Sequence, residues 1–516
     1  MNPRRTVVCV LLFLLALTAN GFIDADAVSQ AGSVANPVVP GDHPDPTILR
    51  LGSTYWMAST SGDWVPSFSL FRSSDLAHWT AAGAVFTQPP AWASGDFWAP
   101  ELTSGPDGIY VFYAARKKEG PLCVAVADAP QADGPYSDHG PLICQPDGSI
   151  DPSMVRDKNG RPFLVWKEDG NSIGKPTIIW AQPLTADLLH LSGTRSELIR
   201  NNPDTWEGAV VEGPYILRHK GWFYLFYAGN ACCGVACHYA EGVARARRLT
   251  GPWMKDPENP IIRPNHAWLC PGHGTAVTTP FGKDYFLYHA YPAAASVYLG
   301  RESVLDEIHW AGGWPTVNHG TGPSGDAETN LPPPYLENFD DAGLDPEWKW
   351  PIGHRPVFHT GDGVLTIAAA GEGNPMYLAR SAPSLDYEAT VGVPERSDAA
   401  AGLGLVSETT RAITLFRKDA QVLLIRREGL AEQVVARASV PATGTVWLRI
   451  SASADHEAGF SYSTDEQNWR SLNQKIEPGK MLAWDHGLRI SLVADGAAGT
   501  HARFVSFTLR SLPVAR

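Results

Sequence analysis

Gly221-Trp-Phe-Tyr-Leu-Phe-Tyr227 is an alternating, aromatic-rich segment that begins at a turn residue, and four variants of it occur elsewhere in the chain. The variants are Gly52-Ser-Thr-Tyr-Trp-Met-Ala58, Gly108-Ile-Tyr-Val-Phe-Tyr113, Gly160-Arg-Pro-Phe-Leu-Val-Trp166 and Gly282-Lys-Asp-Tyr-Phe-Leu-Tyr288. Their marker residues, Tyr55, Tyr110, Phe163, Tyr224 and Tyr285, are 55, 53, 61 and 61 residues apart. Short strands repeated at such a period are typical of propeller blades. The pattern predicts a five-bladed β-propeller over 36–322, with a sandwich of accidentally similar strands as the alternative.

The sequence beyond these repeats differs from them in composition and in strand pattern. A connector rich in Gly, Pro and Thr, 323–335, ends in Leu331-Pro-Pro-Pro-Tyr335, and the aromatic segment does not recur after it. Strands such as Gly363-Val-Leu-Thr-Ile367 and Gln421-Val-Leu-Leu-Ile425 follow at the spacing of a β-sandwich. The sequence therefore predicts an all-β protein in which a β-sandwich domain, 336–516, follows the propeller.

Length and composition agree with two domains and restrict the partners. A chain of 516 residues is too long for one ordinary core, and 44% hydrophobic with 18% charged residues is a globular composition. The net charge of −13 argues against nucleic acid or an anionic membrane as the main partner. The 18 Trp, 16 Tyr and 18 Phe residues supply aromatic surface of the kind that stacks on sugar rings.

The first residues have the layout of a secretory signal peptide. Arg4 and Arg5 precede a short apolar run, 6–17, and small residues follow at Ala19 and at Ala25-Asp-Ala27. The run is too short to span a bilayer comfortably. We therefore expect residues 1–27 to be removed on export, which predicts a secreted or periplasmic protein with no membrane attachment after cleavage. An uncleaved anchor is the alternative.

Six cysteines follow the predicted cleavage site: Cys123, Cys144, Cys232, Cys233, Cys237 and Cys270. An even count in an exported chain favours disulfide bonds. A metal site in the cluster from Cys232 to His238 is less favoured, because the cluster lacks the paired C-x-x-C spacing of zinc ligands. Since adjacent cysteines rarely bond to each other, we expect Cys232 and Cys233 to have different partners. The sequence leaves the rest of the connectivity open.

Five polar residues lie at similar distances before the five marker residues. They are Asp45, Glu101, Asp151, Glu212 and His273, which precede the markers by 10, 9, 12, 12 and 12 residues. Equivalent positions of successive blades surround one axis of a propeller, so we expect these side chains to converge at one mouth. Asp45 and Asp151 are each followed by a proline, which restricts the backbone there.

Converging carboxylates indicate acid–base chemistry. Such groups repel one another, which raises the pKa of at least one of them. An acid that keeps its proton beside an ionised base is what the hydrolysis of a glycosidic bond requires. A calcium cage is the competing use, but it needs ligands close together in the sequence, and the chain has no D-x-D-x-D run. For each Asp-Pro taken alone, a turn without catalytic function is the alternative.

Several motifs around these residues resemble those of glycoside hydrolase family 43, in the family's order. They are Asn36-Pro-Val-Val39, Asp42-His-Pro-Asp-Pro46, Phe97-Trp-Ala-Pro-Glu101, Ser149-Ile-Asp-Pro-Ser153, Val211-Glu-Gly-Pro214, Pro271-Gly-His-Gly-Thr275, Leu299-Gly-Arg-Glu302 and Gly312-Gly-Trp-Pro315. The second domain opens with Glu337-Asn-Phe-Asp-Asp341 and is similar to the concanavalin-like sandwich of the β-xylosidase-type members. The resemblance implies a five-bladed propeller enzyme of plant cell-wall polysaccharide breakdown.

The resemblance implies a role for each of three carboxylates. Asp45 corresponds to the general base that activates water, and Glu212 to the general acid that protonates the leaving oxygen. Asp151 corresponds to the residue that tunes the pKa of the acid and holds it in place. The family inverts anomeric configuration, so the resemblance implies a base and an acid roughly 6.5–9.5 Å apart. Glu101 has no proton-transfer role in the family and is interpreted as scaffold.

Four more residues are expected to bind substrate. Arg301 matches a sugar-contacting arginine, and Trp64 and Trp98 fall where family members place aromatic walls around the terminal sugar. His273 matches a histidine near the channel axis that, in some members, helps to hold a calcium ion or a water cluster. The resemblance implies no required cofactor; a calcium ion near His273 is the one metal it suggests. The alternatives are core packing for the tryptophans and the histidine, and a surface salt bridge for Arg301.

The leading interpretation is an inverting exo-glycosidase that removes terminal β-D-xylose or α-L-arabinofuranose from hemicellulose or arabinan fragments. Its partner is an oligo- or polysaccharide rather than nucleic acid or membrane, and the sequence predicts no oligomeric state. The cysteine-rich segment between Cys232 and Cys270 is closer to the arabinan-acting members, which leaves the sugar open. An endo-arabinanase with an open groove is one alternative. A non-catalytic carbohydrate-binding propeller is another, which the retention of all three carboxylates disfavours.

Overall fold

The structure is a computed structural model that describes residues 34–294, 296–326, 330–453, 457–477, 481 and 483–513. The predicted signal peptide, 1–27, lies outside these residues. Across the described ranges the elements are strands, apart from one short α-helix and two 3-10 helices: α1 (Ser296–Leu299), η2 (Gly170–Ile173) and η3 (Asn318–Gly320). None of the helices described here is long and apolar enough to cross a membrane. The prediction of an all-β protein is confirmed.

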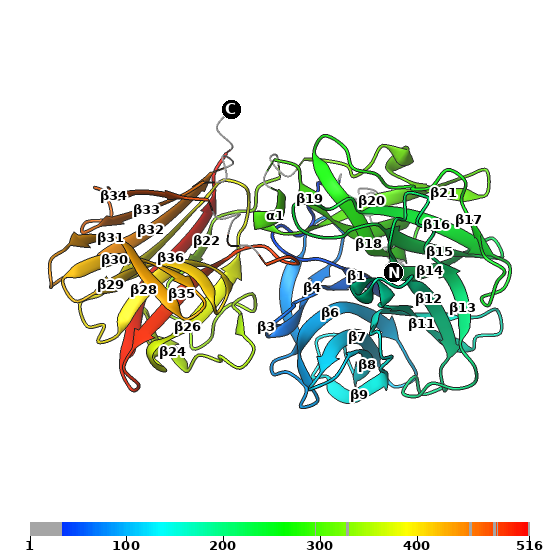
Figure 1. Ribbon diagram of the computed structural model, residues 1–516, viewed down its shortest axis with the longest axis horizontal. Coiled ribbons are helices and arrows are strands. Elements are labelled where there is room, and N and C mark those ends of the chain that lie inside the picture. The colour runs from blue at the N-terminus through cyan, green and yellow to red at the C-terminus, as the bar shows by residue number, and fades with distance from the viewer. Residues whose placement is uncertain are drawn as a thin grey trace, which may run out of the picture.

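The first part of the chain forms five four-stranded antiparallel sheets in sequence order (Figure 1). The first sheet contains β1 (Thr47–Leu51), β2 (Thr54–Ala58), β4 (Ser67–Ser73) and β5 (Thr80–Phe86). The second contains β6 (Ala93–Ser104), β7 (Ile109–Lys117), β8 (Leu122–Ala129) and β9 (Ser137–Ile143), and the third β10 (Ser149–Arg156), β11 (Pro162–Glu168), β12 (Ile178–Pro183) and β13 (Ser196–Arg200). The fourth contains β14 (Val211–His219), β15 (Trp222–Gly229), β16 (Ala240–Ala246) and β17 (Met254–Lys255), and the fifth β18 (Trp268–Thr278), β19 (Asp284–Pro292), β20 (Glu302–Ala311) and β21 (Trp314–Val317).

The aromatic segments supply the second strand of each sheet, and their alternation fills both of its faces. Successive side chains of a strand point to opposite faces, so an uninterrupted apolar segment is buried on both. In β15, Tyr224 and Phe226 pack toward the fifth sheet, whereas Phe223 and Leu225 pack toward the third. The same division in the other second strands gives one apolar cluster between each pair of successive sheets.

The five sheets contact one another in a closed cycle. The first strands β1, β6, β10, β14 and β18 each contact the next, and β18 contacts β1. An apolar cluster that includes Ile48 and Met57 of the first sheet and Leu287 and Leu305 of the fifth joins the last sheet to the first. The first strands are therefore neighbours; four of them carry Trp98, Asp151, Glu212 and His273, and Asp45 comes just before β1.

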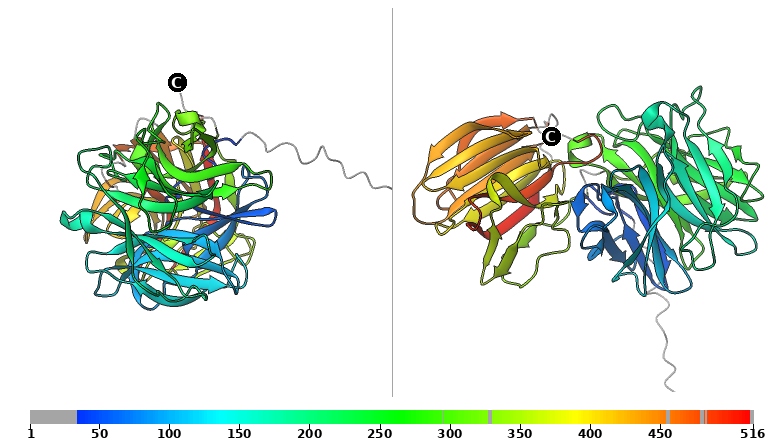
Figure 2. Two further views of the ribbon diagram at one scale, coloured as in Figure 1. Left: turned by 90° about the vertical axis from the view of Figure 1, so that its right-hand side faces the viewer. Right: turned by 60° about the horizontal axis from the view of Figure 1, so that its bottom comes forward.

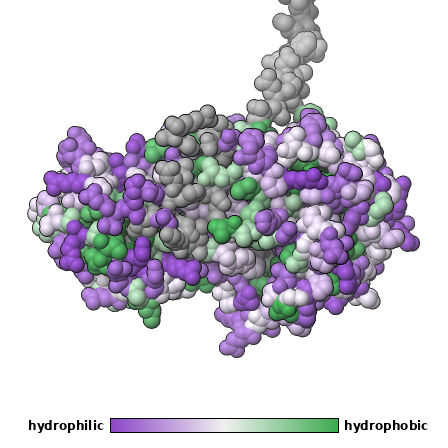
Figure 3. Space-filling view, turned by 45° about the horizontal axis from the view of Figure 1, so that its top comes forward, coloured by the Kyte–Doolittle hydropathy of each residue, from purple (hydrophilic) through white to green (hydrophobic). Residues whose placement is uncertain are grey.

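The second part of the chain forms two antiparallel sheets with an apolar core between them. One sheet contains β22 (Tyr335–Glu337), β24 (Phe358–Gly361), β25 (Val364–Ala368), β27 (Tyr387–Val393), β32 (Val446–Ser453), β33 (Glu457–Ser463), β34 (Arg470–Ile476) and β36 (His501–Ser511). The other contains β26 (Gly371–Ser381), β28 (Ala400–Glu408), β29 (Arg411–Lys418), β30 (Gln421–Glu428), β31 (Ala431–Ser439) and β35 (Arg489–Gly496). This arrangement is a β-sandwich. Figure 3 shows hydrophilic residues over much of the face that it presents of both parts.

The two parts lie side by side and share structure at their contact (Figures 1 and 2). The short strands β3 (Trp64–Val65) and β23 (Trp350–Pro351) pair with each other across the contact. Lys349 Nζ donates a hydrogen bond to the carbonyl of Pro66 at 2.6 Å, and Tyr298 of α1 packs in the sandwich core. Main-chain pairing and apolar packing thus fix the sandwich against the five-sheet part.

Candidate active site

One backbone conformation recurs in or just before the first strand of each of the five sheets. The residues that adopt it have φ angles between 44° and 58°, and they are Asp45, Ala99, Asp151, Gly213 and His273. In β6, β10, β14 and β18 the pairing with the second strand shifts register at this position. A bulge of this kind bends the strand and re-aims a side chain. Asp45, Asp151 and His273 are therefore presented from one repeated backbone position, and Glu212 comes directly before it.

Glu101 is not at this repeated position, because Ala99 occupies it two residues earlier. The Glu101 side chain is buried and accepts a hydrogen bond from Thr47 Oγ1 at 2.7 Å. Burial raises its pKa to about 8, so the group is neutral near pH 7. The expectation that Glu101 converges with the other four residues is not met, since Glu101 precedes its marker Tyr110 by only 9 residues, whereas Ala99 at the repeated position precedes it by 11.

The remaining predicted carboxylates meet in a cavity of about 280 Å³, near the lower end of the size range of small-ligand sites. Its lining includes Asp45, Asp151, Glu212, His273, Arg301 and Trp98 from the five-sheet part, and Trp484 and Asp485 from the sandwich. The rings of Trp98 and Trp484 meet edge to face with centroids 5.9 Å apart. Both parts of the chain therefore build this cavity.

Trp64 lies outside this cavity. Its side chain is buried against the sandwich, in a cluster with Tyr377 and Ala379, and the Arg489 guanidinium lies 4.9 Å from the centre of its ring. It also lines a neighbouring cavity between the two parts, which has Trp484 in common with the first. The structure thus places Trp64 as an interface residue rather than as a wall beside the carboxylates.

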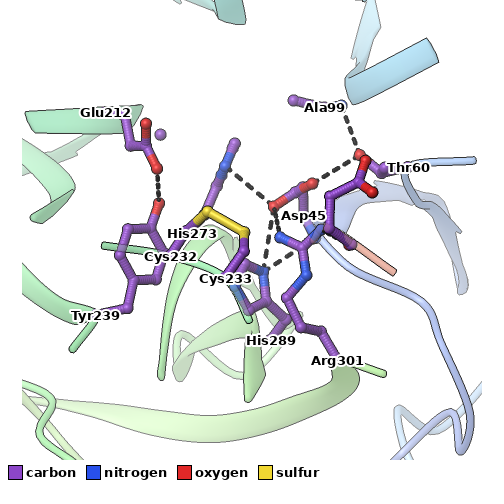
Figure 4. Close-up of polar contacts among 12 residues, drawn as sticks. Asp45, Thr60, Ala99, Glu212, Cys232, Cys233, Tyr239, His273, His289 and Arg301 are labelled. Atoms are coloured by element: carbon purple, nitrogen blue, oxygen red, sulfur yellow. Dashed lines mark hydrogen bonds and ion pairs between the residues drawn. A yellow bond between two sulfur atoms is a disulfide. The ribbon is translucent and has the colours of Figure 1, made fainter. Parts of the chain in front are cut away.

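Asp45 is held by cationic and hydrogen-bonding groups on both carboxylate oxygens (Figure 4). Oδ1 lies 3.2 Å from Arg301 Nη1, 3.2 Å from His289 Nδ1 and 3.4 Å from His273 Nδ1. Oδ2 accepts a hydrogen bond from Thr60 Oγ1 at 2.7 Å. Burial alone raises the pKa of Asp45, but the Arg301 guanidinium, together with His289 and His273, outweighs it and holds the pKa well below the usual range. Asp45 is therefore a fixed, ionised carboxylate.

Glu212 has a different environment, built around a buried lysine. Oε2 accepts a hydrogen bond from Lys167 Nζ at 2.5 Å, and Oε1 accepts one from the Tyr239 hydroxyl at 2.8 Å. Lys167 Nζ also lies 2.8 Å from Asp169 Oδ1. Burial raises the pKa of Glu212, but the charge and hydrogen bond of Lys167 outweigh it and lower that pKa.

Of the two neighbouring carboxyl groups, Asp151 and Glu212, Asp151 is the one that holds a proton. Its Oδ2 accepts the main-chain N–H of Gly213, the residue after Glu212, at 3.0 Å. Burial raises the pKa of Asp151 to about 6; His273 opposes this rise, and the neighbouring Glu212 charge adds to it. Two interacting carboxyl groups of this kind titrate as a pair. The Asp151–Glu212 pair therefore retains one proton under mildly acidic conditions, beside a base that is fully ionised.

Lys167 and His289 are site residues that the sequence reasoning missed. His289 is buried, and its Nδ1 accepts the main-chain N–H of Asp45 at 3.1 Å. Burial lowers its pKa to about 4, so the ring is neutral near pH 7. Lys167 and His289 each lie four residues after an aromatic marker, Phe163 and Tyr285. Counting forward from the markers as well as backward is the signal that finds them.

The cysteines form three disulfide bonds, and one of them corrects a sequence expectation. The pairs are Cys123–Cys144, Cys232–Cys233 and Cys237–Cys270. Cys232 and Cys233 bond to each other, although adjacent cysteines were expected to have different partners. The segment between β15 and β16 turns back on itself here, which brings the two side chains together.

Within the described ranges, no group of three or more His, Cys, Asp or Glu side chains is arranged to hold a metal ion. His273 donates its main-chain N–H to Glu241 Oε2 at 3.0 Å, and its Nδ1 faces Asp45. The expected calcium ion near His273 therefore finds no support in these contacts.

Comparisons with known proteins agree with this site. The family model "Glycosyl hydrolases family 43" matches residues 34–315, and "Beta xylosidase C-terminal Concanavalin A-like domain" matches residues 336–508. The chain is 29% identical over 316 residues to "Xylosidase/arabinosidase 43B" of Humicola insolens, covering 56% of each protein. It is 29% identical over 354 residues to "Xylan 1,3-beta-xylosidase" of a Vibrio species, covering 61% of this chain and 63% of that protein. The chain thus spans less than two thirds of the length of these curated relatives.

A solved structure shares the fold over both parts. The crystal structure of xylan beta-1,4-xylosidase from Bacillus halodurans C-125 superposes with a TM-score of 0.75 at 21% identity, covering 93% of this chain and 100% of that one. At that identity the likeness shows the fold alone. The family model, in contrast, matches more than half of the sequence and includes Asp45, Asp151 and Glu212 of the cavity. The protein therefore belongs to glycosyl hydrolases family 43.

Proposed function

We propose that the protein is an inverting exo-glycosidase that removes a terminal β-D-xylose or α-L-arabinofuranose from hemicellulose or arabinan fragments. The observation that carries the proposal is the contrast within one cavity between ionised Asp45 and the proton-holding Asp151–Glu212 pair. Glycoside hydrolysis needs one ionised and one protonated carboxyl group on opposite sides of the scissile bond. The names of the relatives, which include xylosidases and arabinosidases, support a pentose as the sugar.

In this mechanism Asp45 is the general base. The contacts with Arg301 and Thr60 fix its carboxylate in one orientation, so it needs no rearrangement to accept a proton from water. The water attacks the anomeric carbon from the face opposite the leaving oxygen as the glycosidic bond breaks, and its proton passes to Asp45. This direction of attack inverts the configuration at the anomeric carbon, while the leaving oxygen receives a proton from the general acid on its own side.

Glu212 is the general acid, and Asp151 supplies the proton that it donates. Lys167 keeps Glu212 ionised in the unliganded protein, and the proton is then on Asp151. When the glycosidic bond begins to break, negative charge develops on the leaving oxygen beside Glu212. This charge favours transfer of the shared proton from Asp151 to Glu212. Lys167 also keeps the two carboxyl groups close together despite their repulsion.

The cavity walls suit a chain end rather than a continuous polymer. Arg301 Nη2 donates a hydrogen bond to the carbonyl of Asp485 at 2.9 Å, so the sandwich contacts the arginine that holds the proposed base, Asp45. Trp98 and Trp484 stand together at the same cavity and offer aromatic faces to a sugar. A cavity built from both parts of the chain favours exo cleavage over the endo alternative.

The domain organisation and the location in the cell belong to the same proposal. We take the five sheets over 36–322 as propeller blades, which the cycle of first-strand contacts supports, with 323–335 as a linker and 336–516 as the sandwich domain. Export after removal of 1–27 is supported by three disulfide bonds, which are rare in reducing compartments.

A product assay tests the function. The protein is incubated separately with an aryl β-D-xyloside, an aryl α-L-arabinofuranoside and linear arabinan, and the released sugars are separated and identified. Monosaccharide release from one aryl glycoside, with NMR showing the inverted anomer first, supports the proposal and names the sugar. Oligosaccharides from arabinan without monosaccharide contradict exo cleavage, and no release from any substrate contradicts pentosidase activity.

A further inference from the structure

The disulfide bond between Cys232 and Cys233 lies at the cavity of the carboxylates. Both residues line that cavity, and both side chains are half-buried. Figure 4 shows the two sulfur atoms between Glu212 and Tyr239 on one side and Asp45 and Arg301 on the other. Neither cysteine has a role in the proposed acid–base chemistry, so their position calls for another explanation.

The segment that carries this disulfide is fastened at several points. Cys237 is bonded to Cys270 of β18, and the main-chain N–H of Gly234 donates to the Tyr291 hydroxyl at 3.4 Å. Cys232 packs against an apolar cluster that includes Tyr239, whose hydroxyl donates to Glu212. The disulfide is therefore held at a defined position relative to the acid.

The cavity is strongly polar on the side of the carboxylates, where Asp45, Asp151, Lys167, Glu212 and Arg301 line it. Besides the disulfide, its apolar lining consists of Trp98, Leu122, Ile150 and Trp484. A sugar ring has hydroxyl groups at its edge but C–H groups on its faces, and those faces need apolar surroundings when water is excluded. A disulfide between adjacent residues presents sulfur and methylene groups, carries no hydrogen-bond donor, and is polarisable. The small ring that it closes is also rigid, which reduces the entropy lost when a ligand is ordered against it.

We propose that the Cys232–Cys233 disulfide is an apolar wall of the terminal-sugar subsite, against which one C–H face of the bound pentose packs. The inference rests on the proposed function for the identity of the sugar, but the contact itself concerns binding and not bond cleavage. The intact disulfide then sets the affinity for the sugar. Breaking the disulfide leaves two separate, mobile side chains with thiol or hydroxyl groups in place of this wall.

The test uses the double variant Cys232→Ser/Cys233→Ser and a matched control, Cys123→Ser/Cys144→Ser. The control removes another disulfide whose cysteines do not contribute to the cavity lining. Binding of free D-xylose and L-arabinose is measured by calorimetry, which does not depend on turnover, and kcat and KM are measured on the aryl glycosides. All measurements are made well below the Tm of each variant.

We expect the Cys232→Ser/Cys233→Ser variant to bind the preferred pentose on the order of tenfold more weakly, as loss of an apolar contact in a pocket does. Its KM should rise by a similar factor with kcat changed much less, whereas the control should match the wild type in both. Unchanged pentose affinity, equal weakening in both variants, or a wild type that binds neither pentose overturns the inference. A wild type that binds a pentose but hydrolyses no glycoside contradicts only the proposed function, and the affinity comparison still tests the wall.

Discussion

Replacing Glu212 by alanine separates the two steps of the proposed mechanism, protonation of the leaving oxygen and attack by water. The change removes the proton donor, but the lost contacts are limited to Lys167 and Tyr239, and Lys167 keeps its ion pair with Asp169 at 2.8 Å. The fold around the site should therefore persist. General acid catalysis contributes typically 10²–10⁴-fold, which corresponds to about 3–5 kcal/mol of barrier at 1.36 kcal/mol for each tenfold.

This loss should depend on the leaving group. A disaccharide leaves as an alkoxide of high pKa and needs protonation, so its kcat/KM should fall by roughly 10²–10⁴-fold in Glu212→Ala. A dinitrophenyl glycoside leaves as a stabilised phenolate and needs none, so its kcat/KM should fall by less than about tenfold. The assay is the ratio of these two losses, measured with the sugar that the product assay identifies.

Glu101→Gln is the matched control for this experiment. Glu101 is a buried carboxyl group outside the cavity, and its raised pKa of about 8 means that glutamine keeps its neutral state near pH 7. Its kcat/KM on both substrates should stay within about threefold of the wild type. Equal losses on the two substrates in Glu212→Ala, or a leaving-group effect in Glu101→Gln, would refute the assignment of the acid.

Three further predictions concern the base, the shared proton and the sandwich. Asp45→Asn should lower kcat by roughly 10²-fold or more on both kinds of substrate, because water needs its base whatever the leaving group; retained activity on the dinitrophenyl glycoside would argue against that role. The acid must be protonated and the pKa of Asp151 is about 6, so the kcat/KM of the wild type should fall as pH rises through about 6. Lys167→Met removes the cation that lowers the pKa of Glu212, so in a pH–rate profile this fall should move to higher pH. Trp484→Ala should raise KM for disaccharides several-fold. Its Tm should change little, because Trp484 is 62% exposed. An unaltered KM would place Trp484 outside the substrate path.

The sequence predicted the repeat well because burial on both faces of each second strand leaves a visible pattern. Aromatic and aliphatic residues alternate between two clusters in β15, and the same constraint acts on all five second strands. Asp45, Asp151 and His273 could be found from that pattern, since they occupy one repeated backbone position. Glu101 was misplaced because its spacing of 9 residues from the marker was accepted as equivalent to 12, although the repeated position in that sheet is occupied by Ala99, which has no polar side chain to reveal it.

Other parts of the site left no local signal. Lys167 lies near the end of an apolar strand and His289 inside one, so each resembles an isolated polar residue until the repeat is counted forward. Trp484 and Asp485 reach the cavity from the other part of the chain, and only tertiary structure brings them there. The pairing of Cys232 with Cys233 depends on how one connecting segment turns, which composition does not encode.

The pairing of β3 with β23 and the hydrogen bond from Arg301 to the Asp485 carbonyl limit how genes for this chain can recombine. Exchange of the sandwich for one from a distant relative removes the β3–β23 pairing and a support of Arg301 at the same time. The two parts are therefore expected to be inherited together and to change in step at their contact. The outer strands, such as β9 and β17, can vary more freely. Engineering of new specificities should therefore vary both parts in one library rather than exchange them as modules.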